Sequence, residues 1–150
     1  MSTNPLRIAV VTSLFPSPGH PHRGIFAEHR WQALAARGHA VHVLHPQPYA
    51  PPWVGGKWGE IRAMPACETR GALPIGRPRY LHLPGRPRRN ATRFAAAAWR
   101  RIGDPQVLVC DYAWPAAALA PLCRSADLPC LINGRGSDVL EVSGEANLGP

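Results

Sequence analysis

The sequence contains 150 residues, of which 45% are hydrophobic and 17% are charged. These fractions are typical of one globular domain with a substantial core, and they exclude a disordered tail or a coiled coil. No apolar run approaches the roughly 20 residues that a membrane-crossing helix needs, and the first residues lack a charged head followed by an apolar stretch. Secretion and membrane spanning are therefore disfavoured, and we expect a cytoplasmic protein.

The chain is strongly basic, with 17 Lys and Arg residues against 9 Asp and Glu residues and a net charge of +8. Every basic residue except Lys57 is an arginine, which predicts an anionic partner such as phosphate, a lipid head group or nucleic acid. Nine arginines and no acid lie between residues 69 and 103. The candidates for contact with an anion, or with the inner face of an anionic membrane, are Arg88, Arg89, Arg93, Arg100 and Arg101. A solvated face is the alternative, and nucleic acid is disfavoured because no recognition motif accompanies the charge.

The chain offers few metal ligands. Its cysteines form no C-x-x-C pair, and three of them fall in apolar segments, so we interpret them as reduced thiols; they are Cys67, Cys110, Cys123 and Cys130. His20 and His22 lack a third ligand at a usable spacing. We therefore expect no metal and no cofactor.

The first half of the chain begins with a strand, a helix and a second strand. Residues 6–13 form a β-branched run typical of a buried parallel strand, and a proline-rich loop follows. Residues 24–37 are predicted to be helical, with Ala27, Trp31, Leu34 and Ala35 on one face and Gly38 ending the helix. A second strand is predicted at residues 40–45, which completes a βαβ unit.

Residues 46–87 are rich in proline and glycine, and we expect long loops there, with two weak strand candidates at residues 60–66 and 79–83. Regular elements then return. A helix over residues 90–102 with Asn90 as its N-cap, a strand over 106–110, an alanine-rich helix over 115–125 and a strand over 130–132 are predicted. This alternation predicts an α/β fold, a Rossmann-like and mostly parallel sheet with helices on both faces.

Ligands of such sheets bind at the carboxyl ends of the strands, which selects the loops after Ser13, Cys110 and Ile132. The first loop ends with Gly24 immediately before a helix, where free amides and the helix dipole attract anions. A structural turn and a phosphate contact are equally compatible with this glycine. The loop lacks the G-x-G-x-x-G fingerprint, which disfavours a nicotinamide or flavin cofactor.

The other two loops carry polar groups suited to sugars and anions. Asp111 lies beside Tyr112 and Trp114, a combination that suits sugar recognition, although Asp111 could equally cap the following helix. Arg135 could hold a phosphate or a carboxylate, or could bridge two loops. The candidate residues of the third loop are Arg135, Gly136, Ser137 and Asp138.

The order of these segments resembles the amino-terminal domain of family 4 retaining glycosyltransferases. The resemblance rests on residues 7–13, 15–16, 24–26 and 33–44, and on residues 111–115, 128–132 and 135–139, and leaves residues 46–87 unassigned. Two positions depart from the family pattern. Many relatives have a histidine in place of Asp111, and often an Asp-Gly pair in place of Ala116 and Ala117.

The resemblance implies a GT-B architecture, in which two Rossmann-like domains face each other across a cleft. The first domain binds most of the acceptor and the second most of the NDP-sugar, whose sugar is transferred with retention and without an Asp-x-Asp metal site. Gly24 would lie beside the donor diphosphate, whereas Asp111, Tyr112 and residues 135–138 would line the cleft. The resemblance assigns no catalytic residue here. The chain would be a partial acceptor-side domain without its donor-binding domain, and inactive alone.

Two functions from different classes follow. The first is that of a glycosyltransferase fragment from cell-envelope or exopolysaccharide assembly, whose acceptor is lipid-linked or a polysaccharide. The second is that of a non-catalytic Rossmann-like module that docks on an anionic membrane or polyanion. A phosphate-binding hydrolase is disfavoured because Ser-His-Asp and Walker-type spacings are missing from the sequence.

Overall fold

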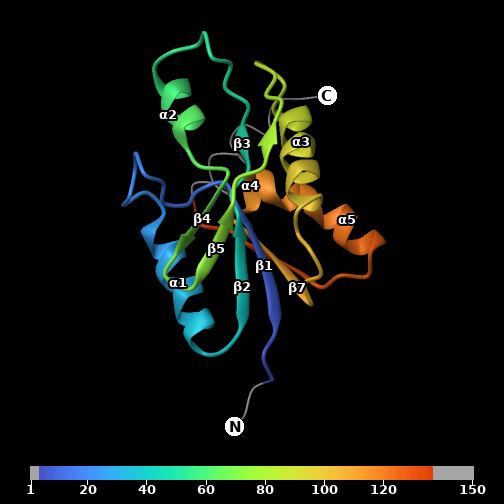
Figure 1. Ribbon diagram of the computed structural model, residues 1–150. Helices are drawn as coiled ribbons and strands as arrows, with labels where there is room; N and C mark the ends of the chain where they lie inside the picture. The colour runs from blue at the N-terminus through green and yellow to red at the C-terminus, as the bar shows by residue number, and fades with distance from the viewer. Residues whose placement is uncertain (1–3, 137–150) are drawn as a thin grey trace.

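The computed structural model describes residues 4–136, which form an α/β fold around a six-stranded sheet of order β4-β5-β2-β1-β7-β8 (Figure 1). Neighbouring strands are parallel except for β4, which is antiparallel to β5. The strands are β1 (Arg7–Thr12), β2 (Ala40–Leu44), β4 (Cys67–Arg70), β5 (Leu73–Gly76), β7 (Val107–Asp111) and β8 (Cys130–Asn133). A separate two-stranded parallel ribbon pairs β3 (Gln47–Pro48) with β6 (Arg79–Tyr80). The predicted Rossmann-like, mostly parallel sheet is therefore confirmed.

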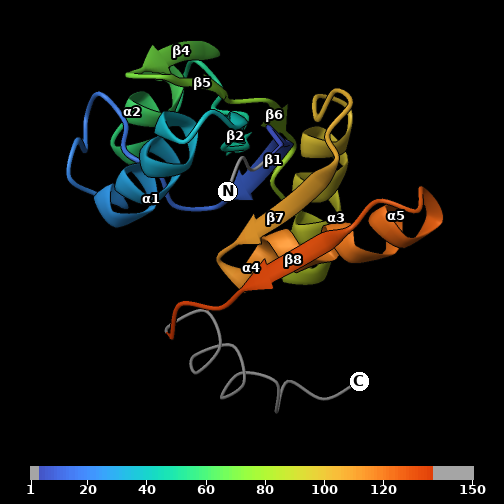
Figure 2. The same ribbon diagram turned by 90° about the horizontal axis from the view of Figure 1, so that it is seen from below.

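Helices cover both faces of the sheet, because alternate residues of the buried strands point to opposite sides. On one face Ile8 and Val10 of β1 pack in a cluster with α1 (Ile25–Ala36). On the other face Ala9 and Val11 pack in a second cluster with three helices (Figure 2). These are α3 (Pro87–Trp99), α4 (Ala113–Ala116) and α5 (Ala120–Ser125), with a single 3₁₀ turn at Ala117–Leu119 between the last two.

Helix α1 agrees with its sequence pattern. Ala27 and Trp31 are buried, and Leu34 and Ala35 pack against the same cluster, so the predicted apolar face is confirmed. The helix ends where expected, since the amide of Gly38 donates to the carbonyl of Ala35 and Gly38 has a φ of 92°.

The predictions for residues 46–87 were partly wrong. The segment predicted as a strand at 60–66 begins within the helix α2 (Lys57–Ala63), and a hairpin of β4 and β5 follows it. Contacts to α1 hold this hairpin in place: Arg70 forms an ion pair with Glu28 at 2.9 Å, and the side chain of Gln32 bonds to the backbone of Arg70 and Ala72. These contacts join segments that are far apart in the chain, so local pattern could not reveal them. The candidate at 79–83 is confirmed only as the short β6.

Two other helices differ from expectation. Helix α3 begins at Pro87, so Asn90 lies in its first turn and is not the N-cap. The Asn90 side chain instead accepts a bond from the amide of Leu83 and donates one to its carbonyl, both at 2.8 Å. The alanine-rich segment is broken into α4, the 3₁₀ turn and α5. Pro121 opens α5, where its missing N–H cannot continue a longer helix.

Two further properties bear on the predictions from composition. All four cysteines are free; Cys110 and Cys123 are buried, Cys130 is half-buried and Cys67 is exposed.

Among residues 4–136, none of the helices combines the length and the apolar character needed to cross a membrane.

Candidate functional site

The three loops selected from the sequence meet at the carboxyl edge of the sheet. Thr12 at the end of β1 pairs with Asp111 at the end of β7, and Asp111 pairs with Asn133 at the end of β8. The chain leaves all three strands on this side because they are parallel. Asp111 therefore lies in the centre of this edge, between the first and third loops.

The Asp111 carboxylate is completely buried and is bound by donors of the protein. The indole Nε1 of Trp31 donates to Oδ2 at 3.0 Å, and the amide Nδ2 of Asn133 donates to Oδ1 at 2.8 Å. No side-chain bond caps α4, so the alternative that Asp111 caps this helix is wrong. The carboxylate is thus satisfied by the protein, and its direct contact with a sugar hydroxyl stays a prediction from the sequence.

Arg135 supplies the principal charge opposite Asp111. Its Nη2 lies 3.0 Å from Oδ1 and 3.2 Å from Oδ2, and its guanidinium lies over the ring of Tyr112 at 5.4 Å. The exposed Arg30 also lies near the Asp111 carboxylate, at a longer distance, with its Nη1 3.8 Å from Oδ1. Of the roles predicted for Arg135, the bridge between loops is the one observed. Gly136 is exposed with a φ of 90°, whereas Ser137 and Asp138 lie outside the described residues.

Sequence reasoning missed two members of this cluster. Trp31 was assigned only to the apolar face of its helix, and Asn133 was not selected at all. A buried indole N–H requires an acceptor, and this requirement is the signal that could have linked Trp31 to a buried carboxylate.

Gly24 forms the turn that starts α1. Its φ of 78° is left-handed, and a Cβ built on it would lie 3.0 Å from the carbonyl oxygen of Leu14 and 3.1 Å from Cα of Phe15. Only glycine fits this close approach of two backbone segments. The structural turn is therefore confirmed, and the contact of Gly24 with a phosphate stays a prediction.

A first cavity, which we call the aromatic hollow, opens beside the loop after β7 and has a volume of about 290 Å³. Its rings come from Tyr80, His82 and Trp114, and 37% of Trp114 is exposed. Its other lining residues are Gly85, Arg86, Pro87, Asn90, Ala91 and Pro115. Exposed aromatic faces next to arginine and amide groups suit a ligand with both apolar and hydroxyl surfaces, such as a sugar.

A second cavity, which we call the basic hollow, lies at the carboxyl ends of β1 and β2 and also has a volume of about 290 Å³. It is lined by Ser13, Leu14, Phe15, Ser17, His20, Arg23, His45, Gln47, Lys57, Glu60, Ile61 and Met64. Ser13 connects the two hollows, because its Oγ donates to the carbonyl of Trp114 at 3.3 Å. The carboxyl edge thus has a binding surface on each side of the end of β1.

The basic hollow contains a neutral histidine surrounded by positive charge. Burial, reinforced by the nearby charge of Arg77, lowers the pKa of His45 from 6.5 to about 3. Arg77 itself is almost completely buried, donates to the carbonyl of Pro16 at 3.1 Å and forms an ion pair with Glu68. Neither His45 nor Arg77 was selected from the sequence as a site residue, although His45 ends a predicted strand on the side where ligands bind.

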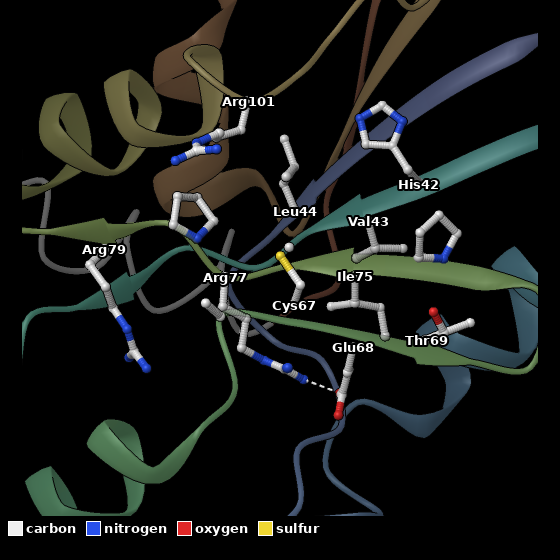
Figure 3. Close-up of a pocket in the computed structure, with 14 residues that line it drawn as sticks. His42, Val43, Leu44, Cys67, Glu68, Thr69, Ile75, Arg77, Arg79 and Arg101 are labelled. Carbon is white, nitrogen blue, oxygen red and sulfur yellow. Dashed lines mark hydrogen bonds and ion pairs between the residues drawn. The ribbon is translucent and has the colours of Figure 1, made fainter.

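A larger hollow of about 670 Å³ lies against β2 and β5 and extends past the last residue of each strand, as far as Arg77 and Arg79 (Figure 3). Its lining includes His42, Leu44, Cys67 and Arg101, and the Arg77 side chain extends toward Glu68 (Figure 3). Burial lowers the pKa of His42. The residues that line this hollow do not belong to the loops after Ser13, Cys110 and Ile132 that the sequence selected.

The five arginines predicted to contact anions do not form one patch. Arg88 and Arg89 are exposed in the first turn of α3, whereas Arg100 and Arg101 are exposed beyond its end. About 13 residues of helix separate the pairs by about 20 Å. Arg93 lies between them and donates to the carbonyl of Leu81 at 3.2 Å. Only the first pair lies at the end of α3 that borders the aromatic hollow, which Pro87 lines.

The fold and the site define a Rossmann-like α/β domain with candidate binding surfaces at the carboxyl edge of its sheet. The chain is 30% identical over 144 residues to a protein of Bacillus subtilis (strain 168) described as "Putative teichuronic acid biosynthesis glycosyltransferase TuaC". The match covers 89% of this chain but 37% of the relative, so the chain spans little more than a third of that protein's length. No family model matches the chain. The chain is therefore similar to part of a protein described as a putative glycosyltransferase.

Proposed function

We propose that the chain is the acceptor-side part of a family 4-like glycosyltransferase with a GT-B architecture. The observation that carries this proposal is the similarity to a described glycosyltransferase over 89% of the chain. A parallel sheet with polar loops gathered at its carboxyl edge supports it, because this edge is where such domains bind ligands.

In the proposed enzyme, a second domain binds an NDP-sugar whose sugar passes to the acceptor with retention and without a metal cofactor. The reaction depends on placing acceptor and donor together and on stabilising the oxocarbenium-like sugar and the departing diphosphate. Gly24 provides the backbone approach for the diphosphate. Asp111 orients Arg135, and Tyr112 with residues 135–138 forms the wall of the cleft.

The acceptor enters at the aromatic hollow, where the exposed ring of Trp114 stacks on a sugar and Arg86 lies at the same opening. A lipid-linked acceptor suits this location because Arg88 and Arg89 are exposed at the same end of α3, as is the side chain of Leu81. These arginines would meet anionic head groups at the inner face of the membrane. The relative's role in teichuronic acid biosynthesis suggests a cell-envelope polysaccharide as the product.

Turnover tests the proposal. The chain is joined to the part of the Bacillus relative that the match does not cover and incubated with nucleotide sugars and a lipid-linked acceptor, and release of nucleoside diphosphate is measured. We expect release from the joined protein and none from the chain alone. Trp114→Ala in the joined protein should raise the KM for the acceptor without changing that for the donor, because this ring contacts only the acceptor. A folded joined protein that shows no turnover with any nucleotide sugar would contradict the proposal.

The rival is a non-catalytic module that docks on anionic membranes, favoured by the exposed arginines of α3. Sedimentation with anionic vesicles tests the docking orientation through two matched double variants. Arg88→Ala with Arg89→Ala should weaken vesicle binding, whereas Arg100→Ala with Arg101→Ala should not, because the second pair lies about 20 Å away along the helix. Equal weakening by both would show that only total charge matters.

A further inference from the structure

The basic hollow holds an unsatisfied polar group deep in its wall. His45 is 5% exposed, and Nδ1 of its ring is buried without a hydrogen-bond partner among the described residues. The backbone of Ser13 lies near the same ring and favours a proton on it, as a carbonyl oxygen does. Buried polar groups in proteins almost always have a partner, so an unpaired nitrogen in a cavity wall indicates a group that binds there.

The chemistry of that group follows from the state of the histidine. Desolvation keeps the ring neutral, and a neutral imidazole that donates through one nitrogen offers the other as an acceptor. The backbone carbonyl of Ser13, next to the end of β1, can only accept, so the ring nitrogen that faces it carries the proton. The unpaired Nδ1 is therefore the acceptor. The partner it lacks is a donor, for which a hydroxyl group is the simplest choice.

The rim of the basic hollow adds positive charge. Arg23 and Lys57 are exposed there, and Arg77 and Arg79 lie close enough to His45 to affect its titration. The acid in the lining, Glu60, is paired with His20 at 2.9 Å. The mouth of the cavity therefore carries more positive than negative charge, and it favours a ligand that is itself an anion.

The size of the cavity limits what it holds. About 290 Å³ lies at the lower limit of ligand pockets, which span roughly 300–1,000 Å³. One small ring fits such a volume, whereas a chain of several sugars does not.

We propose that the basic hollow binds a single sugar unit that carries an anionic group, with Arg23 and Lys57 holding the anion and His45 accepting a hydroxyl proton. The inference rests on the proposed function and deepens it: the acceptor that enters at the aromatic hollow extends past the end of β1, and the sugar that it places in the basic hollow is an anionic one. The anion is a carboxylate or a phosphate ester, since both present the same negative oxygens to these side chains.

Calorimetric titration of the 150-residue chain tests the inference with four probes. Glucuronate and glucose 6-phosphate carry the anion and the hydroxyls, glucose lacks the anion, and inorganic phosphate lacks the ring. We expect at least one anionic sugar to bind about 10-fold or more tightly than both glucose and inorganic phosphate. The stronger of the two identifies the carboxylate or the phosphate ester as the natural group.

Variants identify the side chains responsible. Arg23→Ala and Lys57→Ala should each weaken binding of the anionic sugar by about 10-fold, the size of one lost charge-assisted bond. Arg124→Ala removes the same charge from an exposed residue of α5 and should leave binding unchanged. His45→Phe should remove the preference for the anionic sugar over inorganic phosphate. If that variant fails to fold, the two substitutions of exposed residues still decide the question.

Three results would overturn the inference: glucose or inorganic phosphate binding as tightly as the stronger of the two anionic sugars, no binding of either anionic sugar, or equal weakening by Arg23→Ala and Arg124→Ala. The titration uses the chain without a donor domain, so its outcome is independent of the turnover assay. Turnover by the joined protein without binding of the anionic sugar at Arg23 and Lys57 would contradict this inference alone. Binding of the anionic sugar there without turnover would contradict the proposed function.

Discussion

The guanidinium of Arg135 and the buried carboxylate of Asp111 form an ion pair through two nitrogens: Nη2 lies 3.0 Å from Oδ1 and 3.2 Å from Oδ2, and Nε lies 3.2 Å from Oδ1. The pair ties the loop after β8 to the end of β7. Because the carboxylate is completely buried, its charge depends on partners within the protein.

Neutralising this carboxylate should destabilise the fold. Asp111→Asn removes the charge opposite Arg135 and disturbs the bonds from Trp31 and Asn133, so we expect a loss of about 3 kcal/mol in the free energy of unfolding. Urea unfolding followed by circular dichroism measures the change. The control is Asp104→Asn, which breaks an exposed pair with Arg7 and should cost under about 1 kcal/mol. Similar losses from both variants would contradict the central role of Asp111.

Gly24 should tolerate no side chain, whereas another glycine of the same loop should. Gly24→Ala places a Cβ against the backbone of Leu14 and Phe15 in a left-handed conformation, and we expect a loss of about 1–3 kcal/mol. Gly19→Ala is the matched control, since a Cβ there has no atom within 4 Å. Thermal melts of both variants measure the difference. A melting temperature unchanged by Gly24→Ala would mean that the turn can rearrange.

The helices and strands that were predicted correctly are those whose residue pattern lies within the element itself. The β-branched run of β1 and the apolar face of α1 needed no distant partner to be recognised, and Gly38 stops the helix through its own conformation. The hairpin of β4 and β5 is different, because Arg70 depends on Glu28, which lies 42 positions earlier in the chain. Such a contact leaves no periodic signal in either segment.

The sequence predicted which loops lie at the carboxyl edge of the sheet, but it did not predict which of their side chains bind one another. The rule that ligands bind at the carboxyl ends of strands selected Gly24, Asp111 and Arg135 from three separate loops. Each of the three was expected to contact a ligand, and the sequence could not show that Asp111 and Arg135 bind each other. His45 was missed because it was considered only as the last residue of a predicted strand, and only the folded chain places it in the wall of a cavity.

Acid should weaken the fold through His45. Burial lowers its pKa from 6.5 to about 3, with Arg77, Arg23 and Arg79 adding to the shift, so between these values the unfolded chain binds a proton that the folded chain does not. Stability is therefore complete above pH 6.5 and falls by about 1.4 kcal/mol per pH unit below it. Between about pH 7.5 and about pH 5.0 we expect a loss of about 2 kcal/mol from this residue.

The measurement is urea unfolding at the two pH values. His45→Gln should remove about 2 kcal/mol of the difference between them, because glutamine does not titrate. Gly19→Ala, which removes no titratable group and meets no atom within 4 Å, is the control and should leave the pH dependence as it is. Equal pH dependence in the His45 variant and the unmodified chain would show that folding does not shift the pKa of this ring.

The cysteines should differ in reactivity according to their burial. Burial and the neighbouring Cys130 raise the pKa of Cys123 to about 12 and also raise the pKa of Cys110, whereas Cys67 is exposed. Because the thiolate is the reactive form, iodoacetamide should alkylate Cys67 first and reach Cys110 and Cys123 only after unfolding. Mass spectrometry of peptides from native and urea-treated protein measures this order. Labelling of Cys110 at the rate of Cys67 would contradict the packing of β7.

Lys57, on the rim of the basic hollow, is the single lysine of the chain. An acylating reagent therefore has one side-chain amine to modify, and that amine is at the mouth of a cavity. A fluorophore attached there would report occupancy from a known position without any engineered residue. Conversely, slower acylation of the Lys57 amine in the presence of a small molecule would show that this molecule occupies the cavity.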